Sequence, residues 1–373
     1  MKIINGLVFH ENEGFKEETL YVEHGRFSDH TTDSKVIDAS GAYVIPGLID
    51  IHFHGCVGHD FCDASLEGLT SMAEYELSQG VTSICPASMT LSKDALLEIC
   101  KNGAAYAAMD SAANRSRLVG INLEGPFISY EKKGAQNPEY IVSTDYNALQ
   151  EWQNASGDLV KLITIAPETE GAMDFIQKVK SSHLKDISIS LGHTTSDYDT
   201  AQQAFELGAD HVTHLFNAMP SFTHRAPGVI GAAFDAKHCY AEMICDGVHI
   251  HPSAIRSAFT LFTGKRIVLI SDSMMATGLS DGMYALGGQD VTVKGSHATL
   301  ADGTLAGSVT NLPNCMRTAV SMGIPLTDAV ACTTINPARS IGIDSDFGSL
   351  EFGKVADFVL LNSDLTLREV HKA

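Results

Sequence analysis

Short runs of apolar, mostly β-branched residues alternate with amphipathic stretches from Ile45 to about residue 270. Each run has the length of a buried strand, and the stretches between them show helical spacing of their apolar residues. Eight runs follow this pattern, at Gly47–His52, Val81–Cys85, Leu118–Leu123, Val160–Ala166, Ile187–Leu191, His211–Phe216, Tyr240–Cys245 and Ile267–Ile270. Eight strands separated by helices over about 250 residues are typical of an α/β protein with a (β/α)8 TIM-like barrel. A doubly wound open sheet is the alternative, but no GxGxxG motif follows the first run.

The two ends of the chain show a different pattern. Short strands separated by turns fill the first 45 residues, and residues 348–361 are strand-like again. We expect both ends to form one small β-sandwich domain, of residues 1–46 plus 348–373, beside a barrel of residues 47–347. Within the barrel, the glycine-rich segment 282–304 has alternating apolar residues and predicts an inserted hairpin, and helices are expected from Asn311 to Ile341.

The chain is strongly acidic. Among its 373 residues, 25 Lys and Arg stand against 45 Asp and Glu, which gives a formal net charge of −20 at pH 7. Such a charge repels a phosphate backbone or an anionic membrane, so we expect no nucleic-acid and no membrane partner. An anionic small-molecule substrate would therefore need a local group of basic or donor side chains.

The eight cysteines are scattered, with no CxxC pair, and several lie in apolar runs. We interpret them as buried, reduced thiols. The chain starts in polar sequence without an apolar signal core, and no run of about 18 apolar residues follows. Together these features favour a soluble, cytoplasmic protein.

Titratable side chains stand at the ends of six of the eight runs. They are His52, His54, Glu124, His193, His214, His249 and Asp272. A single histidine at a strand end is more often structural, but the carboxyl ends of barrel strands meet at one mouth, where barrel enzymes carry their sites. Imidazoles and carboxylates gathered there suit a divalent ion such as Zn, Fe, Mn or Co. His211 shares a run with His214, but its odd spacing predicts that it faces the opposite side and is structural.

Several longer motifs point to a known family. The chain reads IPGLIDIHFHG at 45–55, LEGPF at 123–127, GHT at 192–194, THLFNAM at 213–219, DGVH at 246–249 and SD at 271–272. These segments resemble the amidohydrolase superfamily, and the more specific LEGPF, THLFNAM and DGVH resemble its N-acetylglucosamine-6-phosphate deacetylase branch. The similarity extends to LAGS at 305–308 and NPA at 336–338, and so covers essentially the whole chain.

The resemblance implies metal-dependent hydrolysis of N-acetyl-D-glucosamine 6-phosphate to D-glucosamine 6-phosphate and acetate, in amino-sugar catabolism. It implies one ion held by Glu124, His193 and His214, and it leaves open a second ion beside His52 and His54. Glu124 would then bridge the two, since the fourth run has its Lys161 at the start, away from the mouth. An ion of this kind lowers the pKa of water to about 7. Asp272 would take the proton of the attacking water and pass it to the departing amine.

For the substrate, the resemblance implies a phosphate site of His249, Arg225, Asn217 and Ala218. It also implies a sugar site lined by Ala135, Leu305, Ala306 and Gly307. Arg225 would reach the phosphate from the neighbouring subunit of a homodimer, and its guanidinium fork matches phosphate geometry. Many members have a histidine where this chain has Gln136. Gln136 could donate a hydrogen bond to the carbonyl oxygen, but it cannot be cationic.

Two alternatives remain at this point. The same chemistry could act on another substrate, such as N-acetylgalactosamine 6-phosphate or a cyclic amide. The barrel could instead be a non-catalytic scaffold, although such relatives usually lose metal ligands and all of them are present here.

Overall fold

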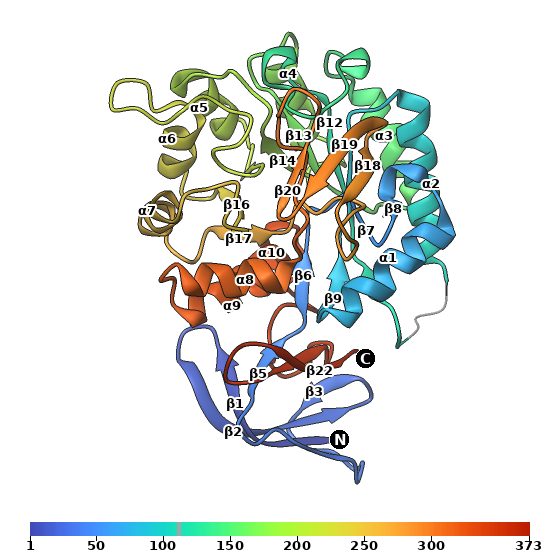
Figure 1. Ribbon diagram of the computed structural model, residues 1–373, viewed down its shortest axis with the longest axis vertical. Coiled ribbons are helices and arrows are strands. Elements are labelled where there is room, and N and C mark those ends of the chain that lie inside the picture. The colour runs from blue at the N-terminus through green and yellow to red at the C-terminus, as the bar shows by residue number, and fades with distance from the viewer. Residues whose placement is uncertain (110–112) are drawn as a thin grey trace.

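The computed structural model describes residues 1–109 and 113–373, and its central feature is a curled sheet of parallel strands (Figure 1). Each of the eight predicted runs contains or overlaps a strand, so the prediction of eight strands is confirmed. The strands are β6 (Leu48–Asp50), β9 (Val81–Ile84), β12 (Ile121–Phe127), β13 (Val160–Ile165), β14 (Ser188–Leu191), β15 (His211–Val212), β16 (Tyr240–Ile244) and β17 (Ile267–Ile270). Short β10 (Ala87–Ser88) and β11 (Arg117–Leu118) continue the pairing around β9 and β12. Nearly every strand residue is buried, as expected for a parallel sheet covered on both faces.

Backbone hydrogen bonds also join the two ends of the curled sheet, just beyond β17 and β6. The Asp272 N–H donates to the His52 carbonyl at 2.9 Å, and the His54 N–H donates to the Ser273 carbonyl at 2.7 Å. The first and eighth strands therefore meet at their carboxyl ends, where the candidate side chains lie.

A helix follows each of these eight strands. They are α1 (Leu66–Ser78), α2 (Lys93–Ala107), α3 (Tyr146–Ser156), α4 (Ala172–Lys180), α5 (Tyr198–Glu206), α6 (Gly228–Asp235), α7 (Pro252–Phe262) and α8 (Leu312–Ser321), with α9 (Leu326–Thr333) and α10 (Ile335–Ser340) after α8. Side-chain caps set several of their starts. In α3, Asp145 accepts hydrogen bonds from the N–H groups of Asn147 and Ala148, and Gly157 ends the helix in the left-handed conformation. The helices pack their apolar faces on the outside of the sheet, with Trp152 and Phe205 fully buried there.

The two chain ends share one sheet, shown at the bottom of Figure 1 near both termini. Its strands are β1 (Lys2–His10), β2 (Gly14–Glu23), β3 (Arg26–Ser28), β4 (Val36–Asp38), β5 (Tyr43–Pro46), β21 (Phe358–Leu361) and β22 (Leu367–His371). Strand β21 runs antiparallel to β5, with Phe358 opposite Pro46, so the predicted pairing of the two ends is confirmed. Residues 348–357 form bends, a short turn and a single antiparallel bridge from Val355 to Arg26 instead of the expected strand.

The predicted insertion after β17 is a three-stranded antiparallel sheet, one strand more than the expected hairpin. It consists of β18 (Gly282–Leu286), β19 (Gln289–Lys294) and β20 (His297–Thr299). The side chain of Leu286 reaches the cavity described below. Helices from Leu312 to Ser340 follow, as predicted.

All eight cysteines are free thiols, and seven of them are buried. Across the described residues, no helix combines the length and the apolar character that crossing a bilayer requires.

Candidate metal centre and active site

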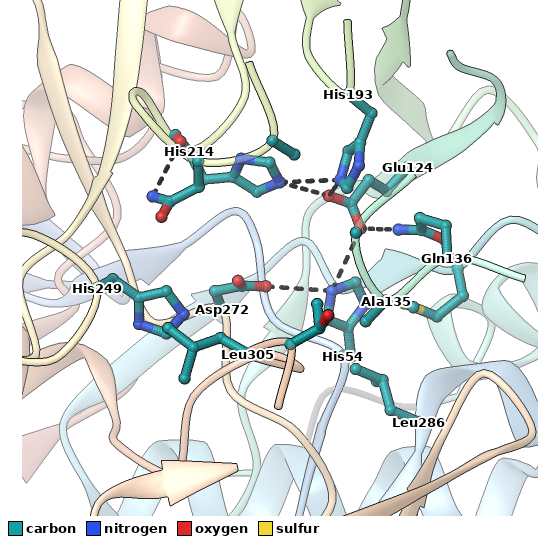
Figure 2. Close-up of a pocket in the computed structure, with 16 residues that line it drawn as sticks. His54, Glu124, Ala135, Gln136, His193, His214, His249, Asp272, Leu286 and Leu305 are labelled. Atoms are coloured by element: carbon teal, nitrogen blue, oxygen red, sulfur yellow. Dashed lines mark hydrogen bonds and ion pairs between the residues drawn. The ribbon is translucent and has the colours of Figure 1, made fainter. Parts of the chain in front are cut away.

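The candidate site is a cavity of about 250 Å³ at the carboxyl ends of the parallel strands (Figure 2). Most of the predicted site residues line it: His54, Glu124, Ala135, Gln136, His193, His214, Asn217, Ala218, His249, Asp272, Leu305 and Gly307. Met89, Gly134, Leu286 and Thr304 also line it, and the sequence analysis missed these four. The cavity thus brings together residues from most of the chain.

Three electron-pair donors face one another at the base of the cavity. Oε1 of Glu124 lies 3.0 Å from Nε2 of His193 and 2.9 Å from Nε2 of His214, and the two nitrogens lie 3.1 Å apart. A tetrahedral ion with bonds of about 2.0–2.1 Å separates its ligand atoms by roughly 3.3 Å, close to this triangle. Nδ1 of His193 lies 2.9 Å from the Lys132 carbonyl, which only accepts, so the proton is on Nδ1 and Nε2 is free to bind a cation.

A second donor group shares Glu124. Nε2 of His52 lies 3.5 Å from Oε1 of Glu124, and Nε2 of His54 lies 3.4 Å from Oε2. In each group, His52–His54–Glu124 and Glu124–His193–His214, one ligand atom per residue lies within 4.8 Å of the others. Nε2 of His52 is buried without a hydrogen-bond partner, as expected for an atom that faces a metal ion. These donor sets fit one or two divalent ions, with the Glu124 carboxylate between them.

The charge of Glu124 reflects this environment. Burial by itself raises the pKa of Glu124, but the imidazoles of His52, His193 and His214 outweigh burial and hold the pKa well below its usual value. The carboxylate is therefore ionised at neutral pH, as a metal ligand must be.

Asp272 also lines the cavity, and its side chain lies near the imidazoles of His54 and His52. Oδ1 of Asp272 lies 3.1 Å from Nε2 of His54 and 3.7 Å from Nε2 of His52. Burial raises the pKa of Asp272, but the hydrogen bond from His54 and the nearby imidazoles more than offset it, so the net shift is downward. Asp272 is therefore ionised at neutral pH, the form in which a carboxylate can act as a general base.

Three of these residues share an unusual backbone conformation. His193, His214 and Asp272 have φ angles of 47°, 28° and 49°, in the left-handed region. Each follows the end of its strand, and the reversal of φ turns its side chain towards the mouth of the sheet. Non-glycine residues in this region carry backbone strain, which clusters at functional sites.

At the far end of the cavity, His249 is held by a carboxylate that the sequence analysis did not select. Nδ1 of His249 lies 2.7 Å from Oδ2 of Asp246, and Oδ1 of Asp246 accepts the backbone N–H of His249. Burial lowers the pKa of His249, but the hydrogen-bonded Asp246 carboxylate outweighs it, and the net shift is upward. His249 is therefore suited to remain cationic and to bind an anionic group.

Gln136 has a fixed orientation beside Glu124. The Thr90 N–H donates to its Oε1 at 2.6 Å, and its Nε2 donates to Oε2 of Glu124 at 2.6 Å. Because Thr90 can only donate there, the amide nitrogen must face Glu124. Gln136 thus orients a metal ligand, and its predicted role as a donor to the substrate carbonyl remains a prediction.

Two predicted substrate residues lie outside the cavity. Ala306 is fully buried and its N–H donates to the Ala298 carbonyl, so only its neighbours Leu305 and Gly307 border the cavity. Arg225 is exposed on the loop before α6, in a separate hollow beside Asp197 and Tyr198. Within one copy of the chain, neither side chain is placed to contact a ligand in the cavity.

The predicted orientation of His211 is wrong, although His211 belongs to neither donor group and does not line the cavity, in keeping with the structural role predicted for it. Its Nδ1 lies 3.6 Å from Oε1 of Glu242, a buried carboxylate that also contacts His52, so His211 lies beneath the donor groups. Strand β15 ends at Val212, and the chain then turns through His214, so alternation no longer relates the two histidines.

Relatives of this chain are found by sequence and by structure. The amidohydrolase family model matches residues 43–372. The chain is 39% identical to an N-acetylglucosamine-6-phosphate deacetylase of Bacillus subtilis, covering 95% of this chain and 91% of the relative. It is 33% identical to the enzyme of that name from Danio rerio, covering 97% and 90%.

A solved structure agrees with these similarities. It is a mutant of N-acetyl-D-glucosamine-6-phosphate deacetylase from Mycobacterium smegmatis in complex with N-acetyl-D-glucosamine-6-phosphate. It superposes with a TM-score of 0.92 at 30% identity, over 100% of this chain and 97% of that one. The fold, the donor groups and these similarities lead to one conclusion: the chain belongs to the amidohydrolase family.

Proposed function

We propose that this protein hydrolyses the acetamide of N-acetyl-D-glucosamine 6-phosphate to give D-glucosamine 6-phosphate and acetate, in amino-sugar catabolism. The observation that carries the proposal is the convergence of Glu124, His193 and His214 on one point, with Asp272 beside them. The similarity to deacetylases of that name over nearly the whole chain supports this substrate.

We infer that one or two divalent ions, of Zn, Fe, Mn or Co, occupy the two donor groups. Such an ion, when bound, supplies Lewis acidity to the amide carbonyl and lowers the pKa of water. Asp272 accepts the proton of the attacking water as the new C–O bond forms. It then returns that proton to the departing nitrogen as the C–N bond breaks, so the amine and acetic acid form, and the acid proton passes to the amine as acetate and the ammonium product leave.

The phosphate end of the substrate would lie at His249, with Asn217 and Ala218 in the neighbouring loop. Leu305, Gly307 and Ala135 would then border the sugar. His249, Leu305 and Ala135 line the same cavity as Asp272, which supports this placement of the substrate (Figure 2).

Arg225 is proposed to reach the phosphate from a second copy of the chain, in a homodimer. Its exposure on the loop before α6 leaves its guanidinium available to another subunit. Replacing Arg225 with Ala is expected to raise KM for the phosphorylated sugar about tenfold or more, because a charged hydrogen bond contributes about 1.5–3 kcal/mol. KM for unphosphorylated N-acetylglucosamine should stay nearly constant. The control is Arg256→Ala, on α7, in which the KM values for both sugars should stay nearly constant. Equal effects on the two sugars would exclude the phosphate role.

Substrate binding should depend on pH through His249. Because Asp246 raises the pKa of His249, the cationic imidazole persists to higher pH, and KM for the phosphorylated sugar should rise as pH increases through that pKa. In Asp246→Asn the pKa of His249 falls, so the rise should begin at lower pH. Steady-state KM measured between about pH 6 and 9 tests this, with unphosphorylated sugar as the control substrate. An unchanged profile in the variant would contradict it.

The proposed function is tested by acetate release from purified protein loaded with Zn²⁺, Mn²⁺, Co²⁺ or Fe²⁺. N-acetylglucosamine 6-phosphate should be cleaved faster than its 4-epimer, N-acetylgalactosamine 6-phosphate. Equal or faster cleavage of the epimer would move the substrate assignment to that sugar. No acetate from either sugar, with metal bound, would refute the deacetylase function.

We further infer that β6 to β17 form a closed (β/α)8 barrel over residues 47–347, beside a small β-domain of residues 1–46 and 348–373. The hydrogen bonds between the ends of β17 and β6, and the shared sheet of the two chain ends, support this division. The eight free cysteines support a reducing, cytoplasmic location.

A further inference from the structure

Glu242 is a buried carboxylate in the middle of β16, beneath the two donor groups. Its side chain is fully inaccessible to solvent. Its Oε2 lies 2.8 Å from Nδ1 of His52 and accepts the backbone N–H of His214 at 3.1 Å. One oxygen therefore ties together residues from the first and the sixth strand.

This contact decides which nitrogen of His52 can bind a cation. A carboxylate oxygen only accepts, so the proton of His52 lies on Nδ1 and points at Glu242. Nε2 is then left with a lone pair, and it is the atom without a hydrogen-bond partner, 3.5 Å from Oε1 of Glu124. The ring of His52 is thus held with its free nitrogen directed at the carboxylate shared by both donor groups.

Two of the other ligand histidines, His54 and His193, are oriented by neutral groups. Nδ1 of His54 lies 3.2 Å from the Ala87 carbonyl, and Nδ1 of His193 lies 2.9 Å from the Lys132 carbonyl. A charged partner makes an imidazole a stronger metal ligand than a carbonyl does. Among these three histidines, His52 is the one with a carboxylate partner.

The charge of Glu242 also needs compensation. Its Oε1 is buried without a hydrogen bond, and its neighbour there is Nδ1 of His211, at 3.6 Å. An ionised group without full hydrogen bonding is costly to bury unless opposite charge lies nearby. A second divalent cation beside His52 would supply that charge.

We propose that Glu242 is a positioning residue for the second ion, holding His52 so that an ion binds between His52, His54 and Glu124. Glu242 meets His214 through the backbone N–H, a hydrogen bond that an uncharged oxygen can also accept, so the ion held by Glu124, His193 and His214 should depend much less on the charge of Glu242. This inference rests on the metal centre of the proposed function, but not on the identity of the substrate.

The test is the Glu242→Gln variant, which can keep both hydrogen bonds through its amide oxygen and loses only the charge. Metal-free protein is dialysed against buffered concentrations of free Zn²⁺ and, separately, Co²⁺, and bound metal per chain is measured by mass spectrometry. Wild type should bind two ions per chain. In the variant, the Kd of the second ion should rise about 10–100-fold, while that of the first ion changes less than about threefold.

Asp246→Asn is the matched control, because it removes the charge from a similar buried carboxylate–histidine pair outside the donor groups. Both of its Kd values should equal those of wild type. If Glu242→Gln does not give a folded protein by circular dichroism, Glu242→Asp replaces it. That variant keeps the charge but draws it back from His52, and it should also weaken the second ion selectively.

A variant that binds both ions as tightly as wild type would overturn the inference, and so would wild type that holds one ion at saturation. Acetate release by wild type is measured in parallel. If wild type releases acetate and the variant binds the second ion as tightly as wild type, the role of Glu242 is refuted and the deacetylase function stands. If the variant loses the second ion selectively but wild type releases no acetate, the role of Glu242 stands and the deacetylase function is refuted.

Discussion

Replacing Asp272 with Asn is expected to lower kcat for acetate release about a thousandfold. The amide side chain has the shape of the carboxylate but cannot accept the proton of the attacking water, and positioned acid–base groups contribute roughly 10²–10⁴-fold to rate. KM should change little, because the predicted contacts to phosphate and sugar lie elsewhere in the cavity. The measurement is steady-state acetate release from N-acetylglucosamine 6-phosphate, with the metal content determined on the same sample.

Asp290→Asn, on the exposed side of β19, is the control for this substitution and should retain wild-type kcat. The ion at Glu124, His193 and His214 should remain in Asp272→Asn, since Asp272 is not one of the three residues of that donor group. Acetate production at the wild-type rate in Asp272→Asn would remove Asp272 from the reaction.

Replacing Glu124 with Ala should abolish metal binding at both donor groups and reduce acetate release to background. Its two oxygens face all four ligand histidines at 2.9–3.5 Å, so its loss removes a ligand from each group at once. Without an ion, water keeps a pKa near 15.7 instead of about 7, and the rate should fall by roughly four orders of magnitude or more. Metal analysis and acetate release on the same preparation measure both effects.

Glu131→Ala is the matched control, since Glu131 is an exposed carboxylate on the segment that follows β12. It should keep full metal content and full activity. A Glu124→Ala protein that still carried one tightly bound ion per chain would show that the remaining histidines suffice for one site, and the shared role of Glu124 would be wrong.

The strands of the curled sheet were predictable because they are buried on both faces. Burial makes them continuous apolar runs such as Ile267–Ile270, which are easy to recognise between amphipathic helices. The gathering of Glu124, His193 and His214 followed from that, since parallel strands bring their carboxyl ends to one edge. The sharing of one sheet by both chain ends was recognisable from the change of pattern near residues 46 and 348.

Other features depend on contacts between residues distant in sequence. Glu242 could have been noticed because it is a charged residue inside an apolar strand. The sequence around it, however, does not show that it contacts His52. The orientation of Gln136 depends on Thr90, 46 residues away. The position of His211 depends on where β15 ends. Alternation describes side chains only inside a strand, and His52, His193, His214 and Asp272 each lie two residues beyond a strand end.

The left-handed backbone at His193, His214 and Asp272 has a consequence for engineering. Each of these conformations costs about 1–3 kcal/mol in a non-glycine residue, and glycine would adopt it freely. Glycine at one of these positions would relieve this strain, but it would also remove a buried side chain that the metal centre or the proton transfer needs. Durable variants of this enzyme are better sought in the outer helices and the terminal sheet, with the rim of the curled sheet left as it is.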